Sequence, residues 1–332
     1  MAMRRRASEG AVRAATRRTK RKTWGGVSPI PHAPSIRGVR LSRKRAPAPP
    51  TAAKFPSFVY NGGPVIASPQ VYTSFWGPLW TRDQAHKSRA DRLSRFHADL
   101  LQSGFMNVLS QYGVGHGAGA AGAFVRATFI GNVPGTLTDP GIQSIIQSSI
   151  TEGVLPEPTT PSIIAVIIYL DETIGVDDAS NGLVLCEAAN DTAFGYHNFF
   201  TTTAGNPFYY AIVPALSDTC LAESCPGNDA GCSLHLSETQ EQRLTQVASH
   251  EFAEMTTDPQ LNAWVDPANG ENGDICNGES DPLTVGTNTW TVQRIYSKYD
   301  DINSSGRVFC LSQAQDPRPR LSPGPTDRLT RS

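Results

Sequence analysis

The run Ile163-Ile164-Ala165-Val166-Ile167-Ile168-Tyr169-Leu170 constrains the fold of this chain more than any other segment. It is far shorter than the ~20 apolar residues of a membrane-spanning helix, and no other run comes closer to that length. Its β-branched residues favour a strand, and a strand without polar alternation is buried on both faces. We therefore expect 163–170 to be the central strand of a layered α/β domain.

The rest of the chain alternates between strand and helix patterns. Strands are predicted near Phe58–Tyr60, Val71–Phe75, Ala123–Phe129, Leu183–Cys186 and Phe208–Val213, and helices over about Arg82–Tyr112, Pro140–Glu152 and Glu238–Thr257. Thr289–Tyr296 and Arg307–Leu311 are expected to form a closing hairpin. This order predicts one α/β domain over about 55–311, with a mixed sheet and flanking helices.

The charge of the chain is concentrated in its first 54 residues. That segment holds 15 Lys and Arg against one acid, Glu9, whereas the remainder holds 14 basic and 29 acidic residues. Because large apolar residues are scarce there, we predict a long disordered N-terminal tail over 1–54, and a second, polar tail over 312–332. The basic tail could contact nucleic acid, although Trp24 is the single aromatic residue among its basic ones, which makes that interpretation the weaker one.

Six cysteines indicate an oxidising compartment. They are Cys186, Cys220, Cys225, Cys232, Cys276 and Cys310. An even count favours disulfides, and the absence of a CxxC pair disfavours a cysteine zinc site. Cys276–Cys310 is the pair we favour, because it would tie the loop after the 238–257 helix to the final strand. An extracellular or cell-surface location follows, although Arg4-Arg5-Arg6 is not followed by the apolar region of a signal peptide.

The segment Ser249-His250-Glu251-Phe252-Ala253-Glu254 carries the candidate chemistry. On a helix, His250 and Glu254 lie one turn apart on one face, which is how a helix offers two ligands to one metal ion. Glu251 stands beside them, where a general base would be needed. The pattern is similar to the His-Glu-x-x-His motif of zinc metalloproteases, with glutamate in place of the second histidine.

An apolar stripe along this helix predicts that it is half-buried, as expected for a helix that carries metal ligands. Its residues are Leu244, Val247, Ala248, Phe252 and Met255. Asp258-Pro259 is expected to end the helix, because the residue before a proline avoids the α region. The alternative is an ordinary surface helix whose histidine and glutamates are solvated.

A third metal ligand is expected from the glycine-rich loop 269–276 that follows. Glu271 and Asp274 are equal geometric candidates, and Asp258 could reach the ion from the end of the helix. The alternative is that the polar residues of this region bind calcium or only form turns, although no EF-hand spacing is present. Those residues are Asp266, Asn269, Glu271 and Asp274.

The ligand set bears on which metal is bound. One imidazole and two carboxylates neutralise a divalent cation, so its Lewis acidity is weaker than with two imidazoles. Zn²⁺ is the expected cofactor, and carboxylate-rich ligation makes Mn²⁺ or Ca²⁺ credible substitutes. His197 could be a further ligand or a transition-state donor, but a structural histidine is the favoured interpretation because most buried polar groups simply find partners.

The chain also resembles a family of proteins. The block from Ser249 to Cys276 looks like the hallmark segment of bacterial and fungal proteins related to the plant phosphate-induced/exordium group. Weaker similarities lie at Tyr60–Gly77, Tyr196-His197, Tyr210–Pro214 and Val292–Ser297. The resemblance implies an extracellular or cell-surface α/β domain with a zincin-like metal site, and brings no defined substrate.

These observations predict metal-dependent hydrolysis of a peptide, or of a cell-wall substrate. Glu251 would take a proton from metal-bound water, and the hydroxide would attack a polarised carbonyl. An extended peptide would lie along the strand Phe208–Val213. The alternative is a non-catalytic extracellular protein in which the metal only staples the helix to the 271–274 loop. The sequence leaves the oligomeric state undetermined.

Overall fold

The computed structural model describes residues 38–40, 55, 57–115, 122–159, 164–186, 193–224, 233–303 and 308–321. The strands are β1 (Gly38–Arg40), β2 (Val59–Tyr60), β3 (Gln70–Trp76), β4 (Ala123–Ile130), β5 (Thr136–Leu137), β6 (Ile164–Leu170), β7 (Gly175–Asp178), β8 (Leu183–Val184), β9 (Ala193–Thr201), β10 (Pro207–Val213), β11 (Trp264–Val265), β12 (Ser280–Val285), β13 (Asn288–Gln293), β14 (Ile295–Tyr296) and β15 (Cys310–Leu311). The α-helices are α1 (Leu79–Arg82), α2 (Gln84–Leu100), α3 (Gly104–Leu109), α4 (Asp139–Thr151), α5 (Asp218–Ser224), α6 (Gln240–Thr257) and α7 (Lys298–Asn303). Short 3₁₀ turns are η1 (Ser110–Tyr112), η2 (Ala179–Asn181) and η3 (Asp274–Cys276).

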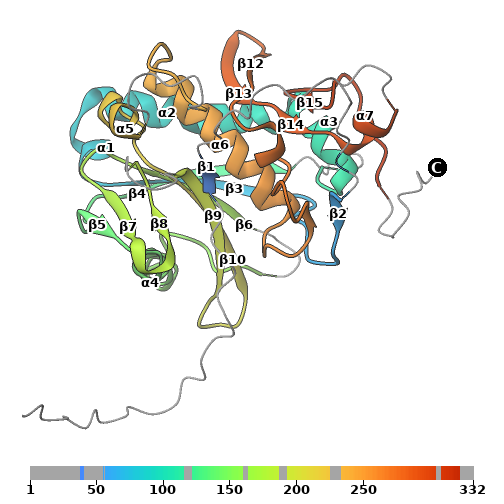
Figure 1. Cartoon of the computed structure of the whole chain (residues 1–332). Coiled ribbons are helices and arrows are strands. Elements are labelled where there is room, and N and C mark those ends of the chain that lie inside the picture. The colour runs from blue at the N-terminus through green and yellow to red at the C-terminus, as the bar shows by residue number, and fades with distance from the viewer. Residues whose placement is uncertain are drawn as a thin grey trace, which may run out of the picture. The chain divides into compact units, whose positions relative to one another are not determined.

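A six-stranded mixed sheet in the order β1-β9-β10-β6-β3-β4 organises the domain (Figure 1). Strands β10, β6, β3 and β4 are parallel, whereas β9 and β1 run antiparallel to their neighbours. Ala165 of β6 lies opposite Tyr209 on one side and Val71 on the other. The predicted α/β class, with a mixed sheet and flanking helices, is confirmed.

Two hydrophobic cores lie on opposite faces of this sheet. Helices α2 and α6 cover one face, and α4 with the small sheet β5-β7-β8 covers the other (Figure 1). Along β6 the side chains alternate, so that Ile167 enters the first core and Ile168 the second. This explains the uninterrupted apolar run. Side chains on both faces of β6 are buried, and burial of each one stabilises the fold by about 1.5–3 kcal/mol.

The single long helix predicted over 82–112 is wrong. The chain forms α1, α2, α3 and η1 in succession, broken at Asp83 and Ser103. Both residues are extended, with ψ of 132° and 173°, and cap the next helix by accepting hydrogen bonds from His86 N and Phe105 N. Such side-chain caps favour a new helix start over continuation of the previous helix.

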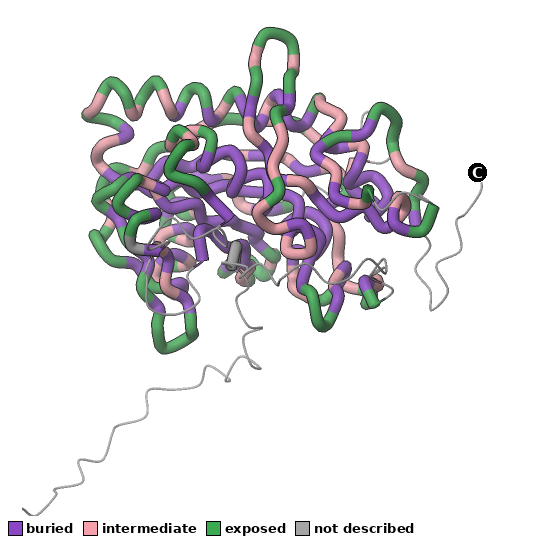
Figure 2. The backbone as a smooth tube through the Cα atoms, turned by 45° about the horizontal axis from the view of Figure 1, so that its top comes forward, coloured by how far each residue is buried: buried purple, intermediate pink, exposed green. Residues whose placement is uncertain are grey.

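The C-terminal prediction needs two corrections. Strand β14 does pair with β15, but β13 pairs with β12 in a separate hairpin that turns at Gly286, where φ is +59°. The hairpin projects from the body with exposed residues at its tip (Figure 2). The domain also extends past Leu311, because residues 312–321 are described and bury Ala314 and Leu321. Backbone bonds from these two residues to Gly104 O and Gln111 O, both 2.9 Å, hold the segment in place.

Two disulfides are described. Cys276–Cys310 joins the end of η3 to β15, as predicted, and Cys186–Cys220 joins the end of the β8 segment to α5. Both are consistent with an extracellular location. Cys225 and Cys232 lie outside the described residues, as do the predicted N-terminal tail apart from β1 and the chain beyond residue 321. None of the helices in the described part of the chain is long and apolar enough to cross a membrane.

Candidate metal centre

Helix α6 is buried far more completely than its sequence predicts. It begins with a capping box between Thr239 and Gln242, and every residue from Arg243 to Thr257 is buried. The half-buried helix of the sequence analysis is therefore corrected. Strands β9 and β10 cover one side of α6, and β13 and the loop before η3 cover another. Because polar groups are costly to bury alone, His250, Glu251 and Glu254 must be compensated inside the protein.

The first group of ligand atoms comes from α6 and the following loop. His250 Nε2 lies 3.1 Å from Glu254 Oε1. Asp274 offers a carboxylate oxygen within 4.8 Å of both ligand atoms, and its backbone N–H donates to the same Glu254 Oε1 at 3.1 Å. His250, Glu254 and Asp274 thus form one group that could hold a metal ion. We call it the His250 set.

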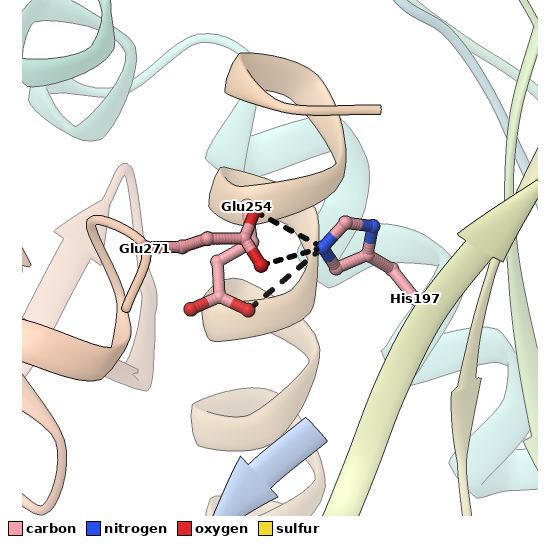
Figure 3. A group of neighbouring side chains, drawn as sticks. All are labelled: His197, Glu254 and Glu271. Atoms are coloured by element: carbon pink, nitrogen blue, oxygen red, sulfur yellow. Dashed lines mark hydrogen bonds and ion pairs between the residues drawn. The ribbon is translucent and has the colours of Figure 1, made fainter. Parts of the chain in front are cut away.

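The second group adds a residue from the sheet. His197 on β9 points at α6, and its Nε2 lies 3.3 and 3.2 Å from the two carboxylate oxygens of Glu271 and 4.0 Å from Glu254 Oε2 (Figure 3). Its three ligand atoms also lie within 4.8 Å of one another, and all three residues are buried. We call this group the His197 set. Glu254 belongs to both sets.

Two glycines allow close contacts of the loop, Gly270 with Asp274 of the loop itself and Gly273 with α6. Gly270 has φ of +87°, and a Cβ there would lie 2.0 Å from Asp274 Oδ2. A Cβ on Gly273 would lie 2.8 Å from both His250 Nδ1 and Glu254 Oε1. The glycine punctuation of the sequence therefore reflects contact between the loop backbone and the ligands.

Hydrogen bonds from β13 and β14 hold the loop over α6. Ser249 Oγ accepts from Gln293 N at 2.9 Å, and Gln293 Nε2 donates to Gly273 O at 2.8 Å. Tyr296 N donates to Asn272 O at 2.9 Å. The serine that begins the motif thus positions the ligand loop through Gln293, a role that helical spacing does not reveal.

Glu251 lies on the side of α6 that meets β9. A Cβ on Gly195 would stand 2.9 Å from Glu251 Oε1, so the carboxylate lies against the β9 backbone two residues before His197. Glu251 is fully buried, and its charge acts on both His250 and Glu271. The predicted general base is therefore adjacent to the ligand groups.

Several carboxyl groups lie close together in the centre, and they shift the pKa values of their neighbours. Burial raises the pKa of Glu271 well above its usual value, and the charges of Glu254, Asp258, Asp274 and Glu251 raise it further. Burial also lowers the pKa of His197 to about 4. For His250 burial acts in the same direction, but neighbouring carboxylates, Glu254 first, outweigh it and raise the pKa to about 10. Without a metal ion, the centre is short of positive charge.

The donor atoms fit a cation. Among the described residues, His250 Nδ1 and Nε2, His197 Nδ1 and Glu254 Oε2 are buried without a hydrogen-bond partner. Such orphaned groups are rare in folded proteins unless an ion or water serves them. Zinc bonds of about 2.0–2.2 Å place neighbouring ligand atoms roughly 3.3 Å apart. The separations of 3.1–4.0 Å between the paired nitrogen and oxygen atoms are close to that spacing.

The structure brings together all four ligands predicted from the sequence, in two sets. His250 and Glu254 meet Asp274 on one side, and Glu254 meets Glu271 on the other. Asp258 belongs to neither set: its Oδ1 accepts from Asn262 N and Ala263 N at the end of α6, and its charge acts on Glu271.

Asp266 and Asn269 form the turn that the sequence allowed as an alternative. Asp266 Oδ1 accepts hydrogen bonds from Ala268 N, Asn269 N and Asn269 Nδ2. Neither residue belongs to a ligand set.

His197 is a member of a candidate set that the sequence analysis favoured as a structural histidine; whether it binds a metal stays a prediction. Strand β9 was not predicted at all, because Gly195, His197 and Asn198 interrupt its apolar pattern. The aromatic residues around them, Phe194, Tyr196, Phe199 and Phe200, were the available signal for a strand.

Comparison with known proteins gives no further assignment: no family model, no curated protein and no solved structure matches this chain.

Proposed function

We propose that this protein is a metal-dependent hydrolase of zincin-like character, with Zn²⁺ as its first-choice ion and Mn²⁺ or Ca²⁺ as substitutes, and with peptides as its substrates. One observation carries the proposal. Two buried histidines and three carboxyl groups from α6, β9 and one loop converge around Glu254, next to Glu251.

The bound ion would polarise a substrate carbonyl and acidify water. Glu251 would accept the proton released when water adds to the scissile carbonyl carbon, and would pass it to the leaving amine nitrogen as the C–N bond breaks. The proximity of Glu251 to Gly195 would hold its carboxylate against β9, two residues before His197. Ser249 and Gln293 would keep the ligand loop in register with α6 during this exchange.

The outer edge of β9 supports a peptide as the substrate class. Residues 38–40 of this chain already pair with it in antiparallel fashion, with Gly38 opposite Tyr196 and Arg40 opposite Ala193. The edge of β9 replaces the strand Phe208–Val213 that the sequence analysis proposed for the peptide. That strand is β10, which lies inside the sheet between β9 and β6. An extended peptide would add to β9 by the same backbone bonds, beside His197, after displacing β1.

A second candidate function is a closed, structural metal site in an extracellular protein. The observation that favours it is burial, because the side chains of His197, His250, Glu254 and Glu271 are 0–1% exposed. A structural site has a full set of protein ligands and no open position. In this alternative the ion fastens the loop and β9 to α6 and does no chemistry.

The location and the family are part of the proposal. The two described disulfides are consistent with an extracellular protein. The block 249–276, which resembles the phosphate-induced/exordium group, is the same segment that supplies α6 and its ligand loop. We propose kinship with the bacterial and fungal members of that group on this basis.

Elemental analysis of purified protein, followed by a peptide-library screen, tests the proposal. Wild type should carry divalent metal and His250→Ala should lose most of it. Glu251→Gln should keep the metal and lose cleavage by about 100-fold or more, as expected when a general base is removed. Glu241→Gln, on the first turn of the same helix, is the matched control and should keep both.

The other outcomes separate the candidates. The structural site would be favoured if wild type binds metal but cleaves no peptide, and if wild type and Glu251→Gln are equally stable. Absence of metal after supplementation with Zn²⁺, Mn²⁺ or Ca²⁺ would overturn both candidates.

A further inference from the structure

We propose that the centre holds two divalent cations bridged by Glu254, one in the His250 set and one in the His197 set. This inference rests on the metal binding of the proposed function and goes beyond it. Each set has one imidazole and one carboxylate of its own: His250 with Asp274, and His197 with Glu271. The single residue that they share is Glu254.

The two oxygens of Glu254 are directed toward different histidines. Oε1 lies 3.1 Å from His250 Nε2, whereas Oε2 lies 4.0 Å from His197 Nε2. Asp274 N also donates to Oε1, so that oxygen is fixed on the side of the His250 set. A carboxylate that presents one oxygen to each of two ligand groups is the arrangement that bridges metal pairs about 3.5–4 Å apart.

One ion does not account for the whole cluster. The ligand atoms lie within 4.8 Å of one another inside each set, and the described residues form two such sets instead of one larger group. A single cation in the His250 set would leave His197 and Glu271 without a metal, and a cation in the His197 set would leave His250 and Asp274 without one.

The charges of the centre also favour two cations over one. The centre gathers four carboxylates, from Glu251, Glu254, Glu271 and Asp274, around two imidazoles. The ion pairs described for Glu254 and Glu271 join them to histidines, which are neutral as metal ligands. Asp258 adds its charge from the end of α6. One divalent cation would therefore offset only part of the buried negative charge, which is costly, and a second cation would offset more of it.

Unpartnered atoms on both sides of Glu254 are an independent sign of two ligand positions. Both ring nitrogens of His250 are buried without a hydrogen-bond partner, on the side of the first set. On the other side, Glu254 Oε2 is also buried without one and lies toward His197. Each proposed ion position thus has a buried ligand atom without a hydrogen bond, His250 Nε2 on one side and Glu254 Oε2 on the other.

The two ions would differ in exchange with solvent. Asp274 is half-buried, whereas His197, Glu254 and Glu271 are all buried. The ion of the His250 set therefore lies nearer to solvent and should be the first that a chelator removes. The ion of the His197 set, held between β9 and α6, should leave more slowly.

Metal stoichiometry on the full-length protein tests the inference. Titration with Zn²⁺, followed by elemental analysis after gel filtration, should give two equivalents for wild type. Glu271→Gln and Asp274→Asn should each retain one, and Glu254→Gln should lose at least the more accessible one. Glu279→Gln removes an exposed carboxylate just after the same loop and should keep two. Circular dichroism checks that each variant is folded.

A second measurement does not depend on the variants folding. Wild type loaded with Mn²⁺ should show the electron paramagnetic resonance spectrum of an exchange-coupled pair. One equivalent of Zn²⁺ with an uncoupled Mn²⁺ spectrum would overturn the bridged pair and leave the proposed metal-dependent function standing. No bound metal in either experiment would overturn both.

Discussion

Two buried carboxyl clusters lie on opposite sides of β9, and they are satisfied in different ways. Tyr196 and Asn198 point toward α4, whereas His197 between them points toward α6. On the α4 side, Asp139 accepts hydrogen bonds from Tyr196, Tyr210, Asn198 and Gln143, at 2.6–3.0 Å. On the α6 side, Glu254 and Glu271 face histidines and further carboxylates.

The difference separates a structural polar cluster from a candidate ligand site. Asp139 has neutral donors for both of its oxygens, so it needs nothing from outside the protein. Burial raises its pKa, and the four hydrogen bonds partly offset that rise. The α6 cluster has too few donors for its oxygens and leaves imidazole nitrogens without partners. A buried acid alone therefore indicates little. It is the surplus of acceptor atoms over donors that makes the α6 cluster a candidate cation site.

The largest expected effect is on the α4 side. Asp139→Ala leaves two buried tyrosine hydroxyls and the buried Asn198 amide without their acceptor, so we expect the free energy of unfolding to fall by about 3–5 kcal/mol. Urea unfolding of the metal-free protein measures it. Tyr196→Phe, which removes one of the four bonds, should cost about 1 kcal/mol. A smaller loss for Asp139→Ala than for Tyr196→Phe would show that the cluster is not a structural one.

A buried histidine outside the centre should contribute to the loss of stability in mild acid. His97 on α2 contacts Tyr169 OH through Nε2 at 2.8 Å, and burial lowers its pKa from 6.5 to about 3. The unfolded chain binds this proton below about pH 6.5 and the folded chain does not. Stability is therefore complete above pH 6.5 and falls as the pH decreases, by about 2 kcal/mol at about pH 5.

His97→Gln removes this titration and isolates it from the other histidines. The difference in unfolding free energy between wild type and His97→Gln should narrow by that amount between about pH 7.5 and 5. A difference that stays constant over this range would mean that His97 has the same pKa in the folded and the unfolded chain. Because both proteins keep His197 and His250, the comparison does not depend on the metal centre.

Gly273→Ala should weaken the centre while leaving the α4 side intact. The added Cβ would meet His250 Nδ1 and Glu254 Oε1 at 2.8 Å, which displaces a ligand. We expect metal affinity to fall by about tenfold or more, as when the support of a ligand is lost. Isothermal titration with Zn²⁺ measures it. Gly131→Ala, whose Cβ would lie 3.8 Å from its nearest neighbour, is the control and should bind like wild type.

The smallest effect is expected where α6 reaches solvent. Glu241 on its first turn pairs with Arg92 of α2 at 2.6 Å, and the Arg92 side chain is 54% exposed. Exposed pairs contribute about 0–1 kcal/mol, so Glu241→Gln should lower the unfolding free energy by at most that amount. A larger loss in thermal unfolding would show that this end of α6 is held by the ion pair more than by its capping box.

Elements set by local sequence were predictable. The capping box at Thr239 and the proline after Asp258 delimit α6, and the predicted helix 238–257 differs from it by two residues at its start. Strand β6 followed from its apolar run. The ligand loop followed from its glycines and acids, and Glu271 and Asp274 both reach the centre.

Elements that depend on contacts between distant parts of the chain could not be predicted from the sequence. Strand β9 carries polar residues because it serves two clusters at once, which weakens the apolar signal of a strand. The break of the 82–112 helix depends on side-chain caps that compete with an otherwise favourable helical pattern. Burial of the whole of α6 depends on the loop and β13 covering it, and neither contact is written in the spacing of the helix itself.

The sequence by itself therefore determined the α/β class, the motif helix and the acids that could bind a metal, because caps, turns and periodicity act over a few residues. The tertiary structure decided the rest. It placed His197 opposite Glu254 and Glu271, divided the acids into two sets, and put β1 in place of β10 at the edge beside them. Residues 197, 254 and 271 are far apart along the chain, and only the packing of α6 against β9 brings their side chains within reach of one ion.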